Sequence, residues 1–323
     1  MKRREFVKNT GFLTAASLIP FSDALSHNGY KLNSTALNDL GIQLFSVPRL
    51  MEEDLVGGVG LLAQMGFKKL ELYGPYPFSA ASAKERWNSL IPRLGFSGSG
   101  FYGKTALEFS SIIRDHDIKI PSMHTDLDTL ENHLDSLAKG SETLGFEYIV
   151  LPALPQEYRK NLEDYKKTAE LFNSIGKKAR QYGLKLTYHN HGYGLGTTDG
   201  ITPMRYLIEH TDPEWVFLEM DLFWTSAGGA DPVEYLKDYP GRYHLMHVKD
   251  MKEKRRFSGD GGDPGQWMEL FPMMCSAGDG VLPLQKIIPA ALKSGVKHFI
   301  VEQDMVAQPE IALQKSIDYL SGI

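Results

Sequence analysis

Short apolar runs rich in β-forming residues alternate along this chain with longer segments of helical spacing. The runs that predict strands cover residues 41–47, 69–73, 118–124, 148–151, 184–189, 215–221, 243–248 and 298–302. The clearest helical segments cover residues 52–65, 127–144, 156–182 and 283–294, and Gly295 is a suitable C-cap for the last of them. Such alternation predicts parallel strands covered by helices. Eight strands in one domain favour an α/β fold of the (β/α)8 TIM-barrel type.

An open, doubly wound sheet is the alternative α/β fold. A dinucleotide-binding fold of that type requires a glycine-rich turn after its first strand. The stretch Gly41-Ile42-Gln43-Leu44-Phe45-Ser46-Val47-Pro48 contains no such turn, so the closed barrel is preferred.

Two connections, residues 74–109 and 251–282, are unusually long and carry glycine and aromatic residues. Long connections in compact domains are usually functional or disordered. Each follows a predicted strand and should therefore lie on the catalytic rim of the barrel. The glycine-rich stretch 259–265 is interpreted as a mobile lid or turn, because its Asp260 and Asp263 would repel a phosphate.

Four successive predicted strands end in residues that bind metal ions well. These residues are His189, Asp221, His247 and Glu302. Imidazoles and carboxylates suit a divalent ion such as Mn, Co, Zn or Mg, and strand ends position ligands rigidly. The sequence therefore predicts one metal site at the carboxyl ends of the strands, where barrel enzymes keep their active sites.

Residues two positions from these ligands share a strand face with them. His191 is predicted to be catalytic while His189 binds the metal, although which of the two is the ligand stays open. Glu219 and Asp221 present the same choice, and Asp221 is preferred because it lies nearer the strand end. Lys249 is expected to hold an oxyanion or a sugar hydroxyl, the alternative being a solvent-facing ion pair.

Other residues on the predicted rim complete the expected site. His124 ends the third strand and is expected to contact substrate or transfer a proton. The predicted catalytic residues are Glu302, His191, His124 and Lys249, and the predicted substrate-binding residues are Gln43, Glu71 and Trp224.

Composition and charge narrow the function further. The net charge of -5 gives no electrostatic basis for binding nucleic acid. Cys275 is the only cysteine, so the chain cannot form an internal disulfide.

The N-terminus predicts export. Residues 1–26 combine Arg3 and Arg4, a short apolar run and a small-residue cleavage site before His27, which resembles a twin-arginine signal peptide. We therefore expect a periplasmic protein with no membrane association after cleavage and a single barrel domain over residues 27–323. Whether copies associate as a homo-oligomer stays open.

Several motifs in barrel order resemble the xylose isomerase-like TIM barrel superfamily, the sugar phosphate isomerase/epimerase family. They are Gly41-Ile42-Gln43-Leu44-Phe45-Ser46-Val47, Tyr188-His189-Asn190-His191, Met220-Asp221-Leu222-Phe223-Trp224, His247-Val248-Lys249-Asp250, Gly278-Asp279-Gly280-Val281 and Val301-Glu302-Gln303-Asp304. The resemblance implies a metal held by His189, Asp221, His247 and Glu302. Epimerases of this superfamily commonly carry a glutamate on the fifth strand, where this chain has His189.

The leading hypothesis is a metal-dependent sugar isomerase or epimerase. The metal would polarise a carbonyl, and Glu302 or a rim histidine would take the proton beside it. A lyase that cleaves 3-oxo-glycosides by β-elimination is the alternative, and His189 favours it because elimination needs only one base and one acid. A non-catalytic sugar-binding barrel is a third possibility. All three imply a small carbohydrate as the ligand.

Overall fold

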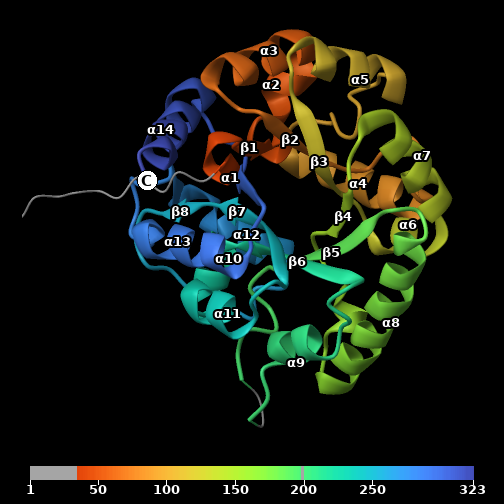
Figure 1. Ribbon diagram of the computed structural model, residues 1–323, viewed down its shortest axis with the longest axis vertical. Coiled ribbons are helices and arrows are strands. Elements are labelled where there is room, and N and C mark those ends of the chain that lie inside the picture. The colour runs from red at the N-terminus through yellow and green to blue at the C-terminus, as the bar shows by residue number, and fades with distance from the viewer. Residues whose placement is uncertain (1–34, 198–199) are drawn as a thin grey trace, which may run out of the picture. The chain divides into compact units, whose positions relative to one another are not determined.

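The computed structural model describes residues 35–197 and 200–323, so the predicted signal peptide lies outside the described residues. Eight parallel strands close into the predicted barrel in the order β1-β10-β7-β6-β5-β4-β3-β2 (Figure 1). They are β1 (Gly41–Gln43), β2 (Lys69–Tyr73), β3 (Lys119–His124), β4 (Tyr148–Leu151), β5 (Lys185–His189), β6 (Val216–Asp221), β7 (Tyr243–Val248) and β10 (His298–Val301). All eight predicted strands are confirmed, with ends that shift by a few residues.

Helices cover the outside of the barrel. They are α1 (Thr35–Asn38), α2 (Pro48–Glu53), α3 (Leu55–Met65), α4 (Ala81–Leu94), α5 (Ala106–Asp115), α6 (Leu127–Asn132), α7 (Leu134–Leu144), α8 (Leu162–Arg180), α9 (Pro203–Glu209), α10 (Leu222–Ala227), α11 (Pro232–Asp238), α12 (Pro264–Leu270), α13 (Leu284–Ser294) and α14 (Pro309–Ser321). Short 3-10 turns are η1 (Leu44–Ser46), η2 (Gln156–Tyr158) and η3 (Phe271–Met273), and β8 (Asp250–Met251) pairs with β9 (Met274–Cys275). None of the helices in this described part has the length and the apolar run that crossing a membrane requires.

The predicted helix over 283–294 is confirmed as α13 with Gly295 as its C-cap, whereas the other three predicted helices are interrupted. Segment 52–65 belongs to two helices that meet at Asp54, whose side chain caps α3 by accepting from Gly57 N at 2.9 Å. Segment 127–144 is broken at His133, which ends α6 and precedes α7. Segment 156–182 begins with η2 before Asn161 caps α8. The capping side chains of Asp54 and Asn161 therefore divide two segments that hydrophobic spacing alone would join, whereas His133 makes no capping side-chain hydrogen bond.

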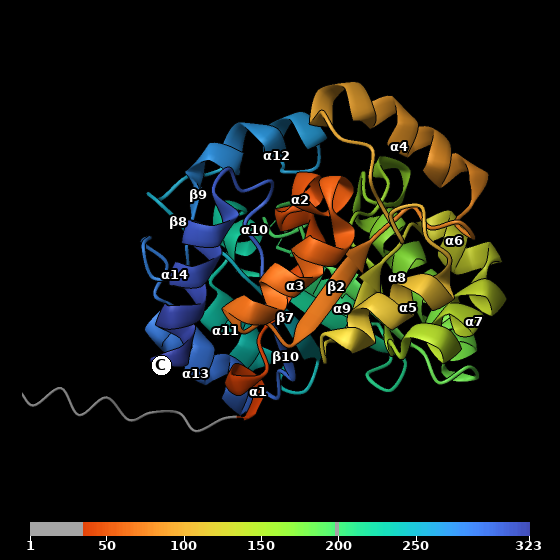
Figure 2. The same ribbon diagram turned by 90° about the horizontal axis from the view of Figure 1, so that it is seen from above.

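Both long connections contain helices, where loops were expected. The connection after β2 includes α4 and α5, and the one after β7 includes α12. Apolar residues of α4 do recur at helical spacing, at Ala83, Trp87, Leu90 and Leu94, but Pro92 lies inside the helix and is typical of a break. Figure 2 shows α4 and α12 at one end of the barrel and α1 at the other. Because α1 leads directly into β1, its end is the amino end of the strands, so α4 and α12 lie at the carboxyl end.

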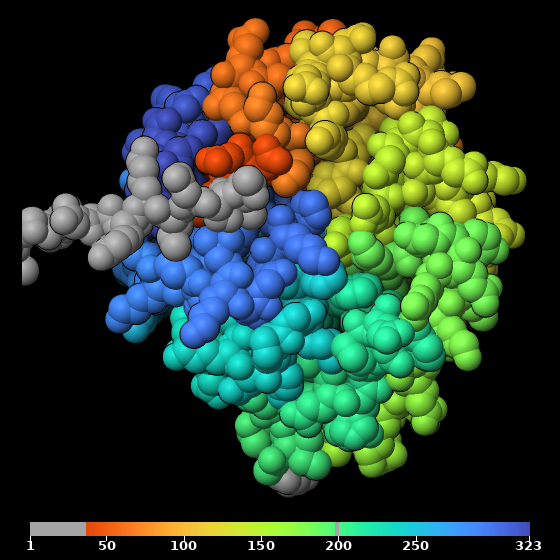
Figure 3. Space-filling view, viewed as in Figure 1, coloured from red at the N-terminus to blue at the C-terminus, as the bar shows by residue number. Residues whose placement is uncertain are grey.

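The register of the strands sets which side chains meet inside the barrel. His189 is paired with Glu219, Asp221 with His247, and Gln43 with Glu71. The β6–β7 register shifts beside Glu219. Alternate side chains along a barrel strand point inward. The polar residues therefore form a cluster above an apolar interior layer of Tyr148, Val150, Leu245 and Ile300. In Figure 3 the end that carries α1 faces the viewer, so the site lies on the far side.

Candidate metal centre and active site

The four predicted metal ligands converge at the carboxyl end of the barrel. The ligand atoms of Asp221, His247 and Glu302 all lie within 4.8 Å of one another, and all three residues are buried. His247 Nδ1 is 2.7 Å from Glu302 Oε2 and 3.9 Å from Asp221 Oδ2. His189 Nε2 lies 3.8 Å from the same Asp221 oxygen. One ion could therefore be shared by residues from β5, β6 and β7 and the residue that follows β10.

Asp221 shows that this group fits a cation. Its Oδ1 accepts from Trp224 N at 2.7 Å and caps α10, whereas its Oδ2 is buried without a hydrogen-bond partner in the structure. Lys249 Nζ is 3.1 Å from that oxygen but is not in hydrogen-bonding geometry. A buried carboxylate oxygen without a partner is costly, and a bound metal would satisfy it. A divalent metal would be held by His189, Asp221, His247 and Glu302.

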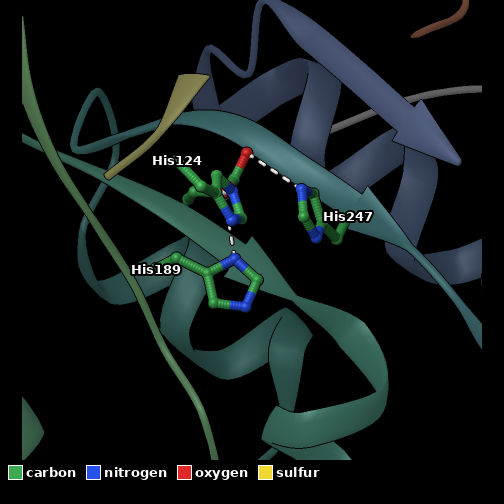
Figure 4. Close-up of side chains that lie close together, drawn as sticks. His124, His189 and His247 are labelled. Atoms are coloured by element: carbon green, nitrogen blue, oxygen red, sulfur yellow. Dashed lines mark hydrogen bonds and ion pairs between the residues drawn. The ribbon is translucent and has the colours of Figure 1, made fainter. Parts of the chain in front are cut away.

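Glu219 is a site residue that the sequence argument passed over. Its Oε2 accepts from His189 Nδ1 at 2.9 Å and from His124 Nε2 at 3.0 Å, and its Oε1 is 3.3 Å from His247 Nε2. Figure 4 shows the rings of His124, His189 and His247 turned toward one another. Carboxylates in this position fix the orientation of metal-binding histidines. The spacing of two residues between Glu219 and Asp221 places both side chains on the inner face of β6, and this spacing was the sequence signal for Glu219.

Glu219 also belongs to a second possible ligand group. Its carboxylate and one nitrogen each of His124, His189 and His247 lie within 4.8 Å of one another. Each of the two rings, His189 and His247, therefore has one nitrogen that faces Asp221 and another that faces Glu219. Among the described residues, Asp221 Oδ2 and Glu219 Oε1 are both buried without a hydrogen-bond donor, so this feature alone does not separate the two groups. We place the predicted metal on the Asp221 side, because Glu219 Oε2 already holds His124 and His189 whereas Glu302 of the Asp221 group lines the cavity.

Glu71 and Gln43, both predicted to bind substrate, are engaged with the protein. Glu71 accepts from Gln43 Nε2 at 2.9 Å, from Ser122 Oγ at 2.5 Å and from His247 Nε2 at 2.5 Å. Gln43 Oε1 in turn accepts from Phe45 N at 3.2 Å. Gln43 lines the cavity described below, whereas Glu71 is fully buried. These bonds make both residues supports for His247, and substrate contact by either stays a prediction.

Neighbouring carboxylates control the charge of two histidines. Burial alone would lower the pKa of His124, but Glu71 and Glu219 outweigh burial and raise this pKa to about 9. Burial opposes a charge on His247 as well, but Glu219, Glu302 and Glu71 raise its pKa well above the usual range. With carboxylates at both ring nitrogens, His247 is an imidazolium until a metal displaces one proton.

His191 differs from these histidines. Burial, together with His189 and Lys249, lowers its pKa well below the usual value, so the ring is neutral. Its Nδ1 has no hydrogen-bond partner in the described structure. The ring packs against Trp267 with centroids 4.2 Å apart and stacks on Trp224 at 5.6 Å. It lines the cavity, as does Trp224. A neutral, oriented imidazole beside the ligands is suited to take a proton.

Lys249 lies among carboxylates instead of facing solvent. Its Nζ is 2.6 Å from Glu302 Oε2 and 2.7 Å from Asp304 Oδ2, and its side chain is 1% exposed. Burial would lower the pKa of Lys249, but Asp221, Asp304 and Glu302 raise it well above the usual range. Burial and Glu302 raise the pKa of Asp304 to about 7. Asp304 was not predicted as a site residue, although it lies two positions beyond Glu302.

These side chains form the floor of one cavity of about 320 Å³, a volume in the range of small-molecule sites. The predicted residues that line it are Gln43, His124, His189, His191, Trp224, Lys249 and Glu302. The ligands Asp221 and His247 lie behind this surface and are fully buried. The cavity therefore brings the predicted catalytic residues together beside the predicted metal site.

Residues 59–322 match the family model described as "Xylose isomerase-like TIM barrel". The chain belongs to this family. Relatives named inosose dehydratase include one from Clostridium perfringens (strain 13 / Type A), 35% identical over 105 residues, which are 32% of this chain and 34% of that protein. Another, from Bacillus cereus (strain AH820), is 30% identical over 162 residues, 49% of this chain and 51% of that protein. The matches thus span about a third to a half of these relatives.

Solved structures share the fold at low sequence identity. A sugar phosphate isomerase/epimerase from Parabacteroides distasonis ATCC 8503 has a TM-score of 0.66 and 22% identity, with coverage of 94% of this chain and 98% of that one. The probable 3-DHS dehydratase AsbF from Bacillus anthracis has a TM-score of 0.61 and 13% identity, covering 88% and 98%. The IOLI protein with a binding zinc atom has a TM-score of 0.61 and 15% identity, covering 87% and 95%. They confirm the predicted barrel.

Proposed function

We propose that this protein is a metal-dependent carbohydrate lyase. It removes a proton beside the carbonyl of an oxidised sugar and expels a group from the next carbon. The observation that carries the proposal is the asymmetry around the ligand cluster. Beside the ligands, the cavity is lined by two groups of different character: His191, a neutral imidazole whose Nδ1 has no partner among the described residues, and the pair of Lys249 and Asp304. This arrangement supplies one base and one acid.

His191 is the proposed base. When bound, the metal would polarise the substrate carbonyl and make the adjacent C–H proton more acidic. The His191 ring is held between Trp224 and Trp267 and therefore needs little reorganisation to accept that proton. The predicted alternative base, Glu302, is already bonded to His247 and Lys249. We therefore assign Glu302 to metal binding.

Lys249 and Asp304 are proposed to assist the second half of the reaction, the departure of the leaving group. The electron pair left by the C–H bond forms a double bond to the next carbon, and the bond from that carbon to the leaving oxygen breaks. The leaving oxygen then needs a proton. Asp304, whose pKa is raised to about 7, donates it while the Lys249 ammonium stabilises the resulting carboxylate at 2.7 Å.

The relatives support elimination over isomerisation, which reverses the order expected from the sequence. Dehydration beside a ketone is a β-elimination of water, and the curated relatives above are named inosose dehydratases. An epimerase would also need a second group to return a proton to the opposite face. The position where epimerases commonly carry a glutamate is occupied by His189, whose Nδ1 is bonded to Glu219.

The test is incubation of the metal-loaded protein in deuterated water with 3-oxo-glycosides, inososes and ketoses. We expect release of the leaving group and an unsaturated ketone, detected by mass spectrometry and ultraviolet absorbance, and loss of both products on chelation. Deuterium uptake without cleavage would instead support isomerase or epimerase chemistry. Tight sugar binding with no turnover of any compound, unchanged by chelation or by Glu302→Gln, would support a non-catalytic sugar-binding barrel.

A further inference from the structure

The side chains that line the cavity are charged beside the predicted metal ligands and apolar beside α4 and α12. The floor carries the charged groups described above. The mouth is formed by half-buried apolar side chains from two insertions on opposite sides, Trp87 and Leu90 of α4 and Trp267 and Met268 of α12, with Phe271 beside them. Figure 2 shows both helices at this end of the barrel. A polar floor and an apolar mouth in one cavity indicate a ligand with two chemically different parts.

The two tryptophans at the mouth line the cavity, and both indole N–H groups are engaged with the protein backbone. Trp87 Nε1 donates to Ser97 O at 2.9 Å, and Trp267 Nε1 donates to Gly261 O at 2.7 Å. Because each indole N–H is already satisfied by a backbone carbonyl, the rings offer apolar stacking surface and no further donor. The chain has four tryptophans, and Trp215 is the one that does not line this cavity.

The charged residues along the cavity do not provide a phosphate site. Its lysine and arginine side chains are Lys249 and Arg86. Lys249 is held by three carboxylates, whereas Arg86 is an exposed residue of α4. Phosphate recognition generally uses several cationic or backbone N–H donors that converge on one point. The mouth is therefore better matched to an uncharged apolar group.

We propose that the mouth is a subsite for an aromatic aglycone. The substrate class is then an oxidised glycoside whose sugar ring lies over the metal ligands and whose aromatic leaving group lies between Trp87 and Trp267. This inference rests on the proposed lyase function, because the aglycone is the group expelled. It also predicts that free polyol ketones, which lack the apolar part, bind more weakly.

The test measures binding separately from turnover. Metal-loaded His191→Gln protein, which lacks the proposed base, is titrated calorimetrically with phenyl and methyl 3-oxo-glucosides. Burying a phenyl ring against aromatic side chains should make the phenyl compound bind about tenfold more tightly or better. Glucose 6-phosphate serves as the comparison ligand for a phosphate site.

Substitutions at Trp87 locate the effect. In the same background, Trp87→Ala should remove most of the phenyl preference and leave methyl glucoside affinity within about twofold, whereas Trp87→Phe should retain much of it. Trp215→Phe is the matched control and should change neither affinity. Trp87 is more decisive than Trp267, because Trp267 packs on the proposed base His191 whereas Trp87 packs on Tyr73 and Phe96.

The outcomes separate the two proposals. Equal affinities for the two glucosides, absence of binding by both, a phenyl preference that survives Trp87→Ala, or tighter binding of glucose 6-phosphate would each overturn the aglycone subsite. If the phenyl preference depends on Trp87 but the unsubstituted protein releases no phenol from the 3-oxo compound, the subsite is supported and the lyase function is wrong.

Discussion

The two ends of the barrel bury histidines in opposite surroundings. At the carboxyl end, His247 has carboxylates at both ring nitrogens, and its pKa is raised. Three residues earlier on the same strand, His244 lies at the amino end, where Tyr148 OH is 3.1 Å from its Nδ1. Burial, Lys297 and Lys185 lower the pKa of His244 to about 4.

Burial lowers the pKa of both histidines, and the comparison teaches that neighbouring charges decide whether that lowering is overcome. Both histidines are largely withdrawn from water, yet one is held positive and the other neutral. His298 at the amino end follows His244, with a pKa lowered to about 4 by burial and Lys69. An excess of carboxylates identifies the end that can hold a metal, whereas lysines and aromatic rings identify the end that is structural.

The largest expected effect comes from Asp221→Asn. The amide can keep the Oδ1 cap on α10 but removes the charge at Oδ2, which accepts no hydrogen bond within the described residues and faces Lys249 Nζ at 3.1 Å. We expect the purified variant to lose its metal and at least about 10³ in kcat/KM. Metal content by mass spectrometry and steady-state rates measure both effects.

Asp250→Asn is the matched control for Asp221→Asn. Asp250 is also buried, but it accepts backbone hydrogen bonds from Met251, Gly278, Gly280 and Leu282. This variant should lose stability and keep its metal. Retention of metal by Asp221→Asn would contradict the assigned ligand set.

His191→Gln should separate catalysis from metal binding. Removal of a general base typically costs about 10²–10⁴ in rate, and the metal content should stay at the level of the unsubstituted protein. Single-turnover assays with deuterium exchange check the missing proton transfer. An active His191→Gln enzyme would return the role of base to Glu302 or His124.

Glu219→Gln tests the residue that orients the histidines. The amide keeps the size of the side chain but weakens its bonds to His124 and His189, and metal affinity should fall about 10–100-fold. Competition titration with a chelator measures the change. If Glu219→Gln abolishes binding while Asp221→Asn leaves it intact, the metal lies in the Glu219 group instead.

The smallest effect is expected at the amino end. The unfolded chain protonates His244 and His298 near pH 6.5, whereas the folded protein protonates them only near pH 4. Both histidines are neutral in either state above pH 6.5, and as the pH falls from 6.5 toward 4 only the unfolded chain takes up their protons, so the protein loses stability over this interval. In urea titrations over this interval, the His244→Gln/His298→Gln variant should lose less unfolding free energy than the unsubstituted protein. An unchanged slope would mean that both histidines titrate normally.

Strand order and the four ligands could be predicted because both follow from local patterns. An apolar run that ends in His or Asp places that residue on the rim of a parallel barrel, whichever strand is its neighbour. The predictions for His189, Asp221, His247 and Glu302 needed no long-range information. The structure brings all four residues together.

The remaining features depend on distances across the barrel. Gln43 and Glu71 have the residue types of substrate contacts, but Ser122 and His247 occupy the Glu71 carboxylate. Glu219 differs from Asp221 only in its depth along β6. The aromatic mouth was not predicted because α4 contains Pro92, which obscures the helical spacing of Ala83, Trp87, Leu90 and Leu94.

The central claim is that one divalent metal is held by His189, Asp221, His247 and Glu302 at the carboxyl end of the barrel. The most direct measurement is an anomalous difference map from a crystal grown with Mn²⁺ or Zn²⁺. A single strong peak within about 2.0–2.3 Å of atoms from these four residues is the predicted result. A peak among His124, Glu219 and the opposite nitrogens of His189 and His247, or no peak at this end of the barrel, would contradict the claim.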